Sequence, residues 1–346
     1  MNIFDIVTAN EVAVFWNNNI QNRPPFIGET LFPDNKQLGL KLAWIKGASG
    51  VPVVLKPSAF DVNATIRPRI GFSKLEAEMP FFKESKRIDE SLRQELNMIM
   101  QTNNQAYIDV IANRIFDDQT DLLEGARARR EQMRMMMLTT GAIAMEGNGQ
   151  TFEYDYDLPS GHKSTVTTSW SDTETSTPLE DLRAALDKIE EDTGVRPTRG
   201  MISAKAWGYL RRNAGIISAV YLNAGGTVTV NDTRLSKLLL DELGLELIKN
   251  EKRYKDDNGT VQRYLDEDTV VLFPSGELGK TWFGTTPEES DLMSGTNAEV
   301  SIVDTGVAVT TIKHTDPVTV ETKVTMICLP SFEQADQVYI LDTSNP

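Results

Sequence analysis

Residues 88–137 read IDESLRQELNMIMQTNNQAYIDVIANRIFDDQTDLLEGARARREQMRMMM and contain no proline. Apolar side chains recur in this stretch at three-, four- and seven-residue steps, the spacing that places them on one face of an α-helix. The asparagine pair at 103–104 and the aspartate pair at 117–118 interrupt the pattern. The stretch therefore predicts a long helix, broken near these two pairs, as the central element of the fold. Its apolar positions are Ile88, Leu92, Leu96, Ile99, Ile108, Ile111, Ile115, Leu122, Ala126, Met133 and Met137.

Three arginines lie on the same predicted helix beside the apolar positions. Arg127, Arg130 and Arg134 are spaced at i, i+3 and i+7, so they share one face. The formal net charge of the chain is −15, which favours a solvated face, a subunit contact or an interior face over phosphate recognition.

The sequence before the helix predicts an extended arm and a long hairpin. Residues 1–41 contain a short apolar-periodic piece and a proline-rich stretch from Arg23 to Pro33 that prevents a continuous helix. Residues 42–80 alternate strand-like runs with glycine and proline, which indicates a two-stranded excursion. A long two-stranded ribbon is only marginally stable alone, so we expect its side chains to contact another subunit. The candidate contact residues are Trp44, Ile45, Val53, Leu55, Arg67 and Arg69.

The sequence after the helix predicts a mixed α/β unit followed by strands. A strand pair is expected at 142–145 and 151–156, joined by a turn. Thr177-Pro178-Leu179-Glu180 matches a capping box and starts a helix that ends at Gly194. Helices at 204–213 and 235–243 then alternate with strands at 200–202, 245–248 and 269–273, with a hairpin turn at Asn258-Gly259 between the last two. Residues 300–346 are almost entirely strand-like.

The overall composition is that of a folded, water-facing protein. Of its 346 residues, 40% are hydrophobic and 25% are charged, and Cys328 is the single cysteine. One cysteine excludes an intrachain disulfide framework and indicates a reducing compartment. No positively charged start or long apolar run indicates secretion or a membrane span, so we expect a cytoplasmic protein.

The chain contains no catalytic, cofactor-binding or metal-binding motif. Gly279-Lys280-Thr281 follows an apolar strand, but the spacing of a phosphate-binding loop is missing and no helix is expected after it. His162 and His314 lie among polar residues without a metal-type partner at helical spacing, so both are interpreted as solvated. The numerous carboxylates are interpreted as solvated surface groups.

The order of arm, hairpin, long helix, α/β unit and final strands resembles the major capsid proteins of tailed bacteriophages, in particular the family of the lambda capsid protein E. The resemblance spans most of the chain. It depends on the order of the predicted elements and on short stretches of similar sequence, because the family has no catalytic signature. The stretches that carry it are WIKG at 44–47, VVLKP at 53–57, RIGF at 69–72, MPFFKE at 79–84 and GELGKTWFGTTPEE at 276–289.

The resemblance implies an α+β fold, the tailed-phage major capsid fold that encapsulins and the herpesvirus capsid floor share. It implies an N-terminal arm at 1–41, an extended loop at 42–80, and a peripheral domain at 81–176 and 318–346 that contains the long spine helix. An axial α/β domain is implied at 177–317. The same resemblance implies hexamers and pentamers of one chain, closing into an icosahedral shell around packaged double-stranded DNA that is bound only non-specifically.

The implied partners are a portal protein, possible decoration proteins and a separate scaffolding protein, because the chain has no long, charged helical extension at its start. The implied location is the virion capsid, assembled in the host cytoplasm, with no membrane contact. No enzymatic activity, cofactor or metal is expected.

Two alternatives remain open from the sequence. An encapsulin-type compartment would have the same fold and would enclose a cargo enzyme. A different class of protein, a soluble α/β enzyme, would use a carboxylate-based site, for which Asp155, Asp157, Asp266 and Asp268 are the candidates.

Overall fold

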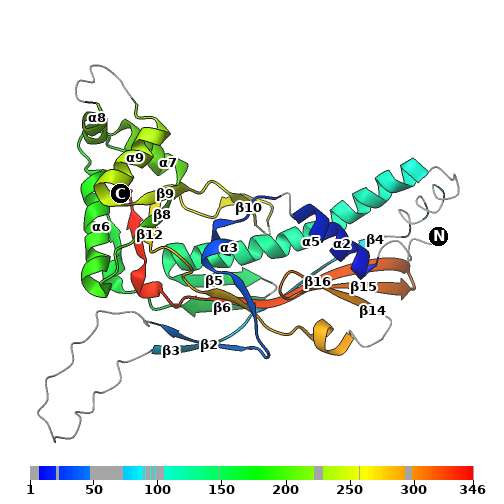
Figure 1. Ribbon diagram of the computed structural model, residues 1–346. Coiled ribbons are helices and arrows are strands. Elements are labelled where there is room, and N and C mark those ends of the chain that lie inside the picture. Colours follow the sequence, from blue (N-terminus) through cyan, green and yellow to red (C-terminus); the bar gives the residue numbers. More distant parts are fainter. Residues whose placement is uncertain are drawn as a thin grey trace, which may run out of the picture. The chain divides into compact units, whose positions relative to one another are not determined.

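The computed structural model describes residues 8–20, 23–46, 73–88, 90, 94, 98, 105–147, 149–221, 229–256, 258–292 and 298–345. The chain divides into two compact units (Figure 1). The first, which we call the sheet unit, comprises residues 1–42, 76–134 and 280–331. The second, the α/β unit, comprises residues 43–75, 135–279 and 332–346. Each unit is therefore assembled from three separate stretches of sequence.

The sheet unit is built around one long strand, β16 (Val318–Ser331). Its first nine residues pair with β15, and its residues 320–327 pair with β4 on the other edge. Its last four residues pair with β13, which in turn pairs in parallel with β1. The other strands of this sheet are β1 (Asp34–Lys36), β4 (Phe81–Ile88), β13 (Lys280–Phe283), β14 (Ala298–Val303) and β15 (Val307–Thr315).

The pairing of β14 and β15 corrects the expected domain boundary at residue 317. Both strands were assigned to the axial domain, but β15 forms an antiparallel pair with β16 and β14 continues the same sheet. Strand β17 (Tyr339–Asp342), expected in the peripheral domain, pairs instead with β12 and β7 of the α/β unit. Hairpin hydrogen bonding thus keeps residues 298–331 together, across the boundary that the sequence suggested.

The N-terminal segment is helical where an extended arm was expected. Helix α2 (Ala9–Ile20) buries Ala9, Val12, Ala13 and Trp16 and packs against β14 and β15. Their spacing at i, i+3, i+4 and i+7 is that of a single helix face. The short helix α3 (Ile27–Leu31) follows the Pro24-Pro25 pair. The prolines therefore separate two helices, and the prediction of an extended arm was wrong for residues 9–20.

The long helix, α5 (Gln105–Thr140), runs without a break for 36 residues. Asp117 and Asp118 are exposed and part of the helix, so the predicted interruption at this pair was wrong. Ile88, which was assigned to the helix, is the last residue of β4. The pair at 103–104 lies outside the described residues. Within the described ranges, no helix combines the length and apolar character that crossing a membrane requires.

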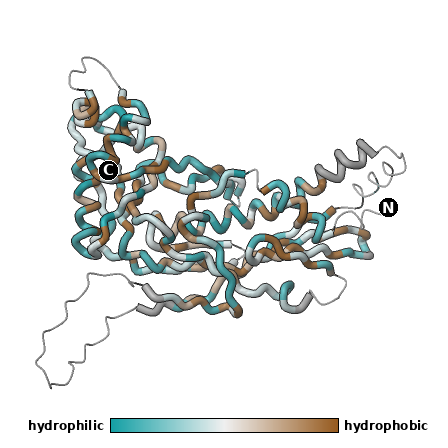
Figure 2. Tube along the Cα trace, in the orientation of Figure 1, coloured by the Kyte–Doolittle hydropathy of each residue, from teal (hydrophilic) through white to brown (hydrophobic). Residues whose placement is uncertain are grey.

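The α/β unit contains a five-stranded sheet in the order β7-β17-β12-β8-β9. Its helices carry hydrophobic and hydrophilic residues in alternation along the chain (Figure 2) and bury one side in a common core that includes Trp170, Leu186 and Leu239. The strands not yet given are β7 (Lys163–Thr165), β8 (Arg199–Ile202), β9 (Glu246–Lys249) and β12 (Thr269–Phe273). The helices are α6 (Pro178–Thr193), α7 (Ala204–Arg212), α8 (Ala214–Val220) and α9 (Asp232–Leu243).

The helix ends of this unit largely follow the sequence signals. Gly194 and Gly244 end α6 and α9 in the left-handed conformation, as predicted. Thr177 precedes α6 and Pro178 takes its first position, but the Thr177 side chain makes no capping hydrogen bond. The predicted capping box was therefore wrong in its side-chain bonds. Asn231 does cap α9, because its Oδ1 accepts from the Arg234 amide at 2.9 Å.

Three pairs of strands form separate two-stranded sheets: β2 (Lys41–Lys46) with β3 (Ser73–Glu78), β5 (Ala142–Gly147) with β6 (Gln150–Asp155), and β10 (Arg253–Lys255) with β11 (Val261–Arg263). The last two match the predicted hairpins, with Gly149 and Gly259 at positive φ in their turns. The first pair forms the base of the predicted excursion. Short helical turns complete the described chain: η1 (Ser160–His162), η2 (Glu288–Leu292) and η3 (Ala335–Gln337).

Candidate functional site

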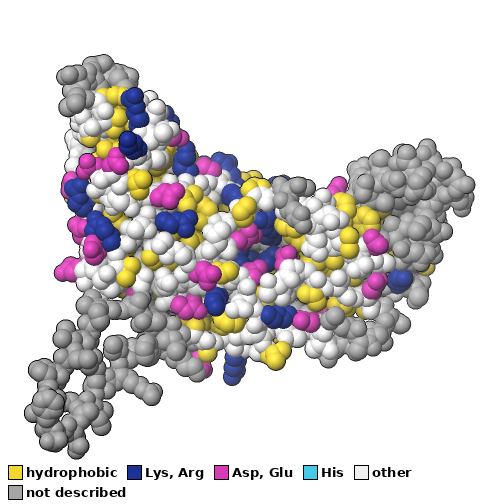
Figure 3. Space-filling model, in the orientation of Figure 1, with side chains coloured by type: hydrophobic (Ala, Val, Ile, Leu, Met, Phe, Trp, Pro, Cys, Tyr) yellow, Lys and Arg dark blue, Asp and Glu magenta, His cyan; other side chains and the backbone are white. Residues whose placement is uncertain are grey.

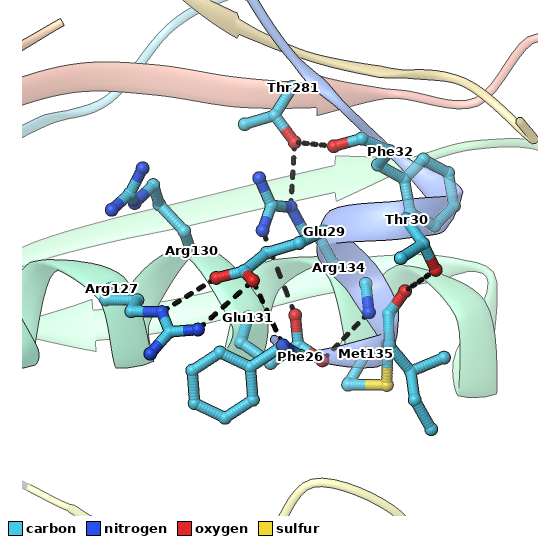
Figure 4. Close-up of polar contacts among 12 residues, drawn as sticks. Phe26, Glu29, Thr30, Phe32, Arg127, Arg130, Glu131, Arg134, Met135 and Thr281 are labelled. Atoms are coloured by element: carbon cyan, nitrogen blue, oxygen red, sulfur yellow. Dashed lines mark hydrogen bonds and ion pairs between the residues drawn. The ribbon is translucent and has the colours of Figure 1, made fainter. Parts of the chain in front are cut away.

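The three arginines of α5 form a buried cluster inside the sheet unit. Arg127, Arg130 and Arg134 are 7%, 4% and 1% exposed, respectively. We call them the arginine cluster. Figure 4 shows Arg127 bonded to Glu29 of the α3 segment and Arg134 bonded to Thr281 of β13, with Arg130 between them along α5. Because a buried guanidinium needs carboxylate or carbonyl partners, the contacts of this cluster define which parts of the chain it holds together.

Arg127 binds the N-terminal segment through Glu29. Its Nε donates to Glu29 Oε1 at 2.7 Å and its Nη2 donates to Glu29 Oε2 at 3.1 Å, a bidentate ion pair (Figure 4). The guanidinium also lies over the ring of Phe26, 4.6 Å from its centroid. Burial alone would raise the pKa of Glu29, but the hydrogen bonds and charge of Arg127 outweigh burial and lower it. Glu29 is therefore held as a carboxylate.

Arg130 and Arg134 share Asp34, the first residue of β1. Arg130 Nη1 donates to Asp34 Oδ2 at 3.0 Å, and Arg134 Nη2 donates to Asp34 Oδ1. Arg130 Nη2 also donates to Asp304, between β14 and β15, at 2.6 Å. Asp304 in turn accepts from the indole N–H of Trp16 in α2 at 3.3 Å. The cluster thus connects α2, β1 and the β14–β15 turn to α5.

Glu131 adds a buried carboxylate to the cluster. It is 1% exposed, and its Oε1 accepts from the Gly28 amide at 3.1 Å. A Cβ at Gly28 would clash with the Glu131 carboxylate and would lie 2.9 Å from Cδ of Arg134. The close approach of α3 to α5 therefore requires glycine at this position. Arg134 also donates from Nε to Thr281 Oγ1 at 2.8 Å, which includes β13 in the network.

These contacts correct the expectation of a solvated stripe or a subunit contact. The arginines are buried in their own chain and are paired with its own carboxylates. Helical spacing identified the shared face, but it could not show that Glu29, Asp34 and Asp304 cover that face. Arg130, for example, is separated by 96 residues from Asp34 and by 174 from Asp304.

The structure describes two of the six predicted contact residues of the extended loop. Trp44, in β2, is 7% exposed, and its ring lies 5.5 Å from that of Tyr156 within the α/β unit. Its contacts within its own chain correct the expectation of a subunit contact. Ile45 lies in β2, but its side chain is outside the described set. Val53, Leu55, Arg67 and Arg69 lie outside the described residues.

The two histidines and the single cysteine lie in different surroundings. His162 is 1% exposed and its Nε2 lies 3.0 Å from Asp192 Oδ2, so the prediction that it is solvated was wrong. His314 is partly exposed and lies 3.0 Å from Glu321. Burial raises the pKa of the Cys328 thiol to about 12, so the thiol is protonated at neutral pH.

The stretch Gly279-Lys280-Thr281 leads directly into strand β13, which begins at Lys280 and ends at Phe283. In the part of the chain that the structure describes, no group of three or more His, Cys, Asp or Glu side chains is arranged to hold a metal ion.

The two units, the long helix α5 and the strand pair β2–β3 define an α+β fold of the tailed-phage major capsid type. A crystal structure of a protein assigned as the capsid protein of an E. coli CFT073 prophage is similar over 98% of this chain and 99% of its own, with a TM-score of 0.61 and 15% identity. A phage-related protein of Bordetella bronchiseptica RB50 is similar over 97% of both chains, with a TM-score of 0.56 and 12% identity.

The chain belongs to the phage major capsid protein E family, whose sequence model matches residues 11–343. A search of curated proteins found no match. The resemblance noted from the sequence is therefore confirmed over nearly the whole chain. The protein is a structural component of a phage capsid, its copies assemble into a shell, and its place is the virion.

Proposed function

We propose that copies of this chain form hexamers and pentamers that close into an icosahedral shell around packaged double-stranded DNA. The observation that carries the proposal is the family match over residues 11–343, which includes most of both units. The assignment favours a phage shell over an encapsulin compartment, because the matched family is one of phage major capsid proteins.

The arginine cluster holds the N-terminal elements of the sheet unit against α5, which gives this unit the constant surface that such a lattice needs. A shell built from identical copies requires each copy to present the same surfaces in the same positions. Arg127, Arg130 and Arg134 attach α3, β1 and the β14–β15 turn to α5 through ion pairs, and α2 joins them through the hydrogen bond from Trp16 to Asp304. The role of the arginine cluster is therefore structural.

We propose a scaffolding protein and a portal as partners, with decoration proteins as further candidates, and assembly in the host cytoplasm. DNA contacts would be weak and non-specific, because the net charge of the chain is −15. On the face drawn in Figure 3, basic and acidic side chains are interspersed. Such a surface suits DNA that is enclosed without being bound tightly. We propose a structural role without enzymatic activity, because the matched family is one of capsid proteins.

Negative-stain electron microscopy of the protein expressed with and without its neighbouring genes tests this proposal. We expect closed shells, or rings of six and five subunits, in at least the co-expressed preparation. Uniform small particles in both preparations, under every assembly condition tried, would overturn it.

A further inference from the structure

The hairpin β10–β11 presents a basic face. Arg253 pairs with Arg263 and Lys255 pairs with Val261 across the two strands, so these four side chains share one side. Arg253, Lys255 and Val261 are exposed, Val261 by 53%. Arg263 is compensated by Glu251 and Glu267, at 2.7 and 3.0 Å. Arg253 and Lys255 form no ion pair with any described residue. Two cations and an exposed valine therefore face solvent together.

The hairpin β5–β6 presents an acidic face. Ala142 pairs with Asp155, Ala144 with Glu153 and Glu146 with Thr151, which places three carboxylates on one side. All three carboxylate residues are exposed, whereas Ile143 and Met145 on the other side are buried. Among the described side chains, none forms an ion pair with Glu146, Glu153 or Asp155. The acidic face thus has less charge compensation than the basic one, where Glu251 and Glu267 pair with Arg263 and Glu251 also interacts electrostatically with Arg253.

The two faces complement each other in charge and in shape. Like charges on one side of a two-stranded sheet destabilise it, and such sheets are marginal alone, so each hairpin gains from a partner of opposite charge. The small side chains Ala142 and Ala144 on the acidic face leave room for the exposed Val261. Neither face finds this partner among the described residues of its own chain, which points to another copy.

We propose that the basic face of β10–β11 in one copy docks on the acidic face of β5–β6 in the next copy. This inference rests on the proposed shell function and names two surfaces through which copies in the shell contact each other. The contact joins different surfaces of identical chains, so it is heterologous, and repeated contacts close into a ring when the rotation between copies allows it. Paired charges at the edge of such a contact guide association and fix register.

Charge reversal tests the pairing. One variant carries Arg253→Glu with Lys255→Glu, a second carries Glu153→Lys with Asp155→Lys, and a third combines all four changes. Arg234→Glu with Lys237→Glu, two exposed cations of α9, is the matched control with the same change in net charge as the first variant. The readout is the protein concentration at which rings or shells form, followed by light scattering and checked by electron microscopy. Thermal unfolding verifies that each variant is folded.

We expect each reversal on its own to raise the assembly concentration by at least about tenfold, and the combined variant to return toward the wild-type value. The control variant should assemble like the wild type. If the wild type assembles and the single reversals assemble equally well, or the combined variant fails to recover, this pairing is overturned while the shell function stands. A wild type that never assembles would overturn the shell function and this inference with it. Substitution to Gln at positions 253 and 255 gives a milder change should a reversal variant unfold.

Discussion

At the residue scale, the arginine cluster shows why buried charge is tolerated in this subunit. Arg134 and Glu131 are both 1% exposed, and each has partners that compensate it. Burial of charges is costly, and removing one member leaves the other uncompensated. The contribution of each arginine therefore depends on the carboxylate that it faces.

We predict that Arg134→Ala lowers the free energy of unfolding by about 3–5 kcal/mol, because Glu131 and Asp34 lose a buried countercharge. Denaturant unfolding monitored by fluorescence measures the effect. Adding Glu131→Gln to the same variant should restore part of the loss. Arg129→Ala, on the more exposed side of α5, is the control and should change stability far less. An equal effect of the two single changes would contradict this account.

The ion pair of Glu29 predicts a dependence on pH. Its folded-state pKa is below the ordinary value of 4.5, so its stabilising contribution is complete above that value. The contribution is lost as the pH falls through the lowered pKa. Wild type should be more stable than Glu29→Gln at neutral pH, and the difference should disappear in acid. Urea unfolding of both proteins from pH 7 down to pH 3 checks this, and a difference that grows in acid would reverse the sign we assign.

At the element scale, the α/β unit was largely predictable and the N-terminal segment was not. Glycines 194 and 244 and the apolar run at 269–273 are local signals, and the helices and the strand formed where these signals indicated. The prolines at 24 and 25 suggested an extended arm, yet the spacing of the buried residues in α2 was a helix signal already present in the sequence. The partners of the arginine cluster had no local signal, because they come from distant parts of the chain.

The close approach of α3 to α5 can be tested at Gly28. We predict that Gly28→Ala displaces α3, because the new Cβ would overlap the Glu131 carboxylate. Hydrogen exchange of the α3 and β1 amides should become faster, while exchange in the α/β unit stays unchanged. Gly208→Ala is the control, since the nearest atom that its new Cβ would meet is the flexible tip of Arg212 at 3.8 Å. Unchanged exchange in α3 would show that Gly28 is not required for docking.

Trp44 in strand β2 has a packing role. Because its ring is buried near Tyr156, we predict that Trp44→Ala lowers the free energy of unfolding by about 3–5 kcal/mol. The sequence alone had suggested that Trp44 contacts a neighbouring subunit, in which case its replacement would leave folding unaffected. Chemical unfolding of the isolated Trp44→Ala subunit distinguishes packing within the subunit from contact with a neighbour. An unfolding midpoint equal to that of the wild type would support the contact with a neighbour.

At the scale of the whole molecule, the chain is a capsid subunit whose two units are each assembled from distant stretches of sequence. The order of elements was sufficient to indicate the family. The assignment of the late strands to the two units was not predictable from the sequence. Strands β15 and β16 form a hairpin across the expected domain boundary, while β17 joins the sheet of the α/β unit. Periodicity indicates that a segment is a strand but carries no information about which strand it pairs with, whether the partner is adjacent, as for β15 and β16, or distant, as for β17 and β7.

The most direct test is cryo-electron microscopy of particles from cells that express this chain with its neighbouring genes. The account predicts closed icosahedral shells of pentamers and hexamers in which Glu29 of each subunit binds Arg127 of the same subunit. A protein that remains a small, unassembled particle, or shells in which Glu29 is supplied by a neighbouring copy, would contradict it.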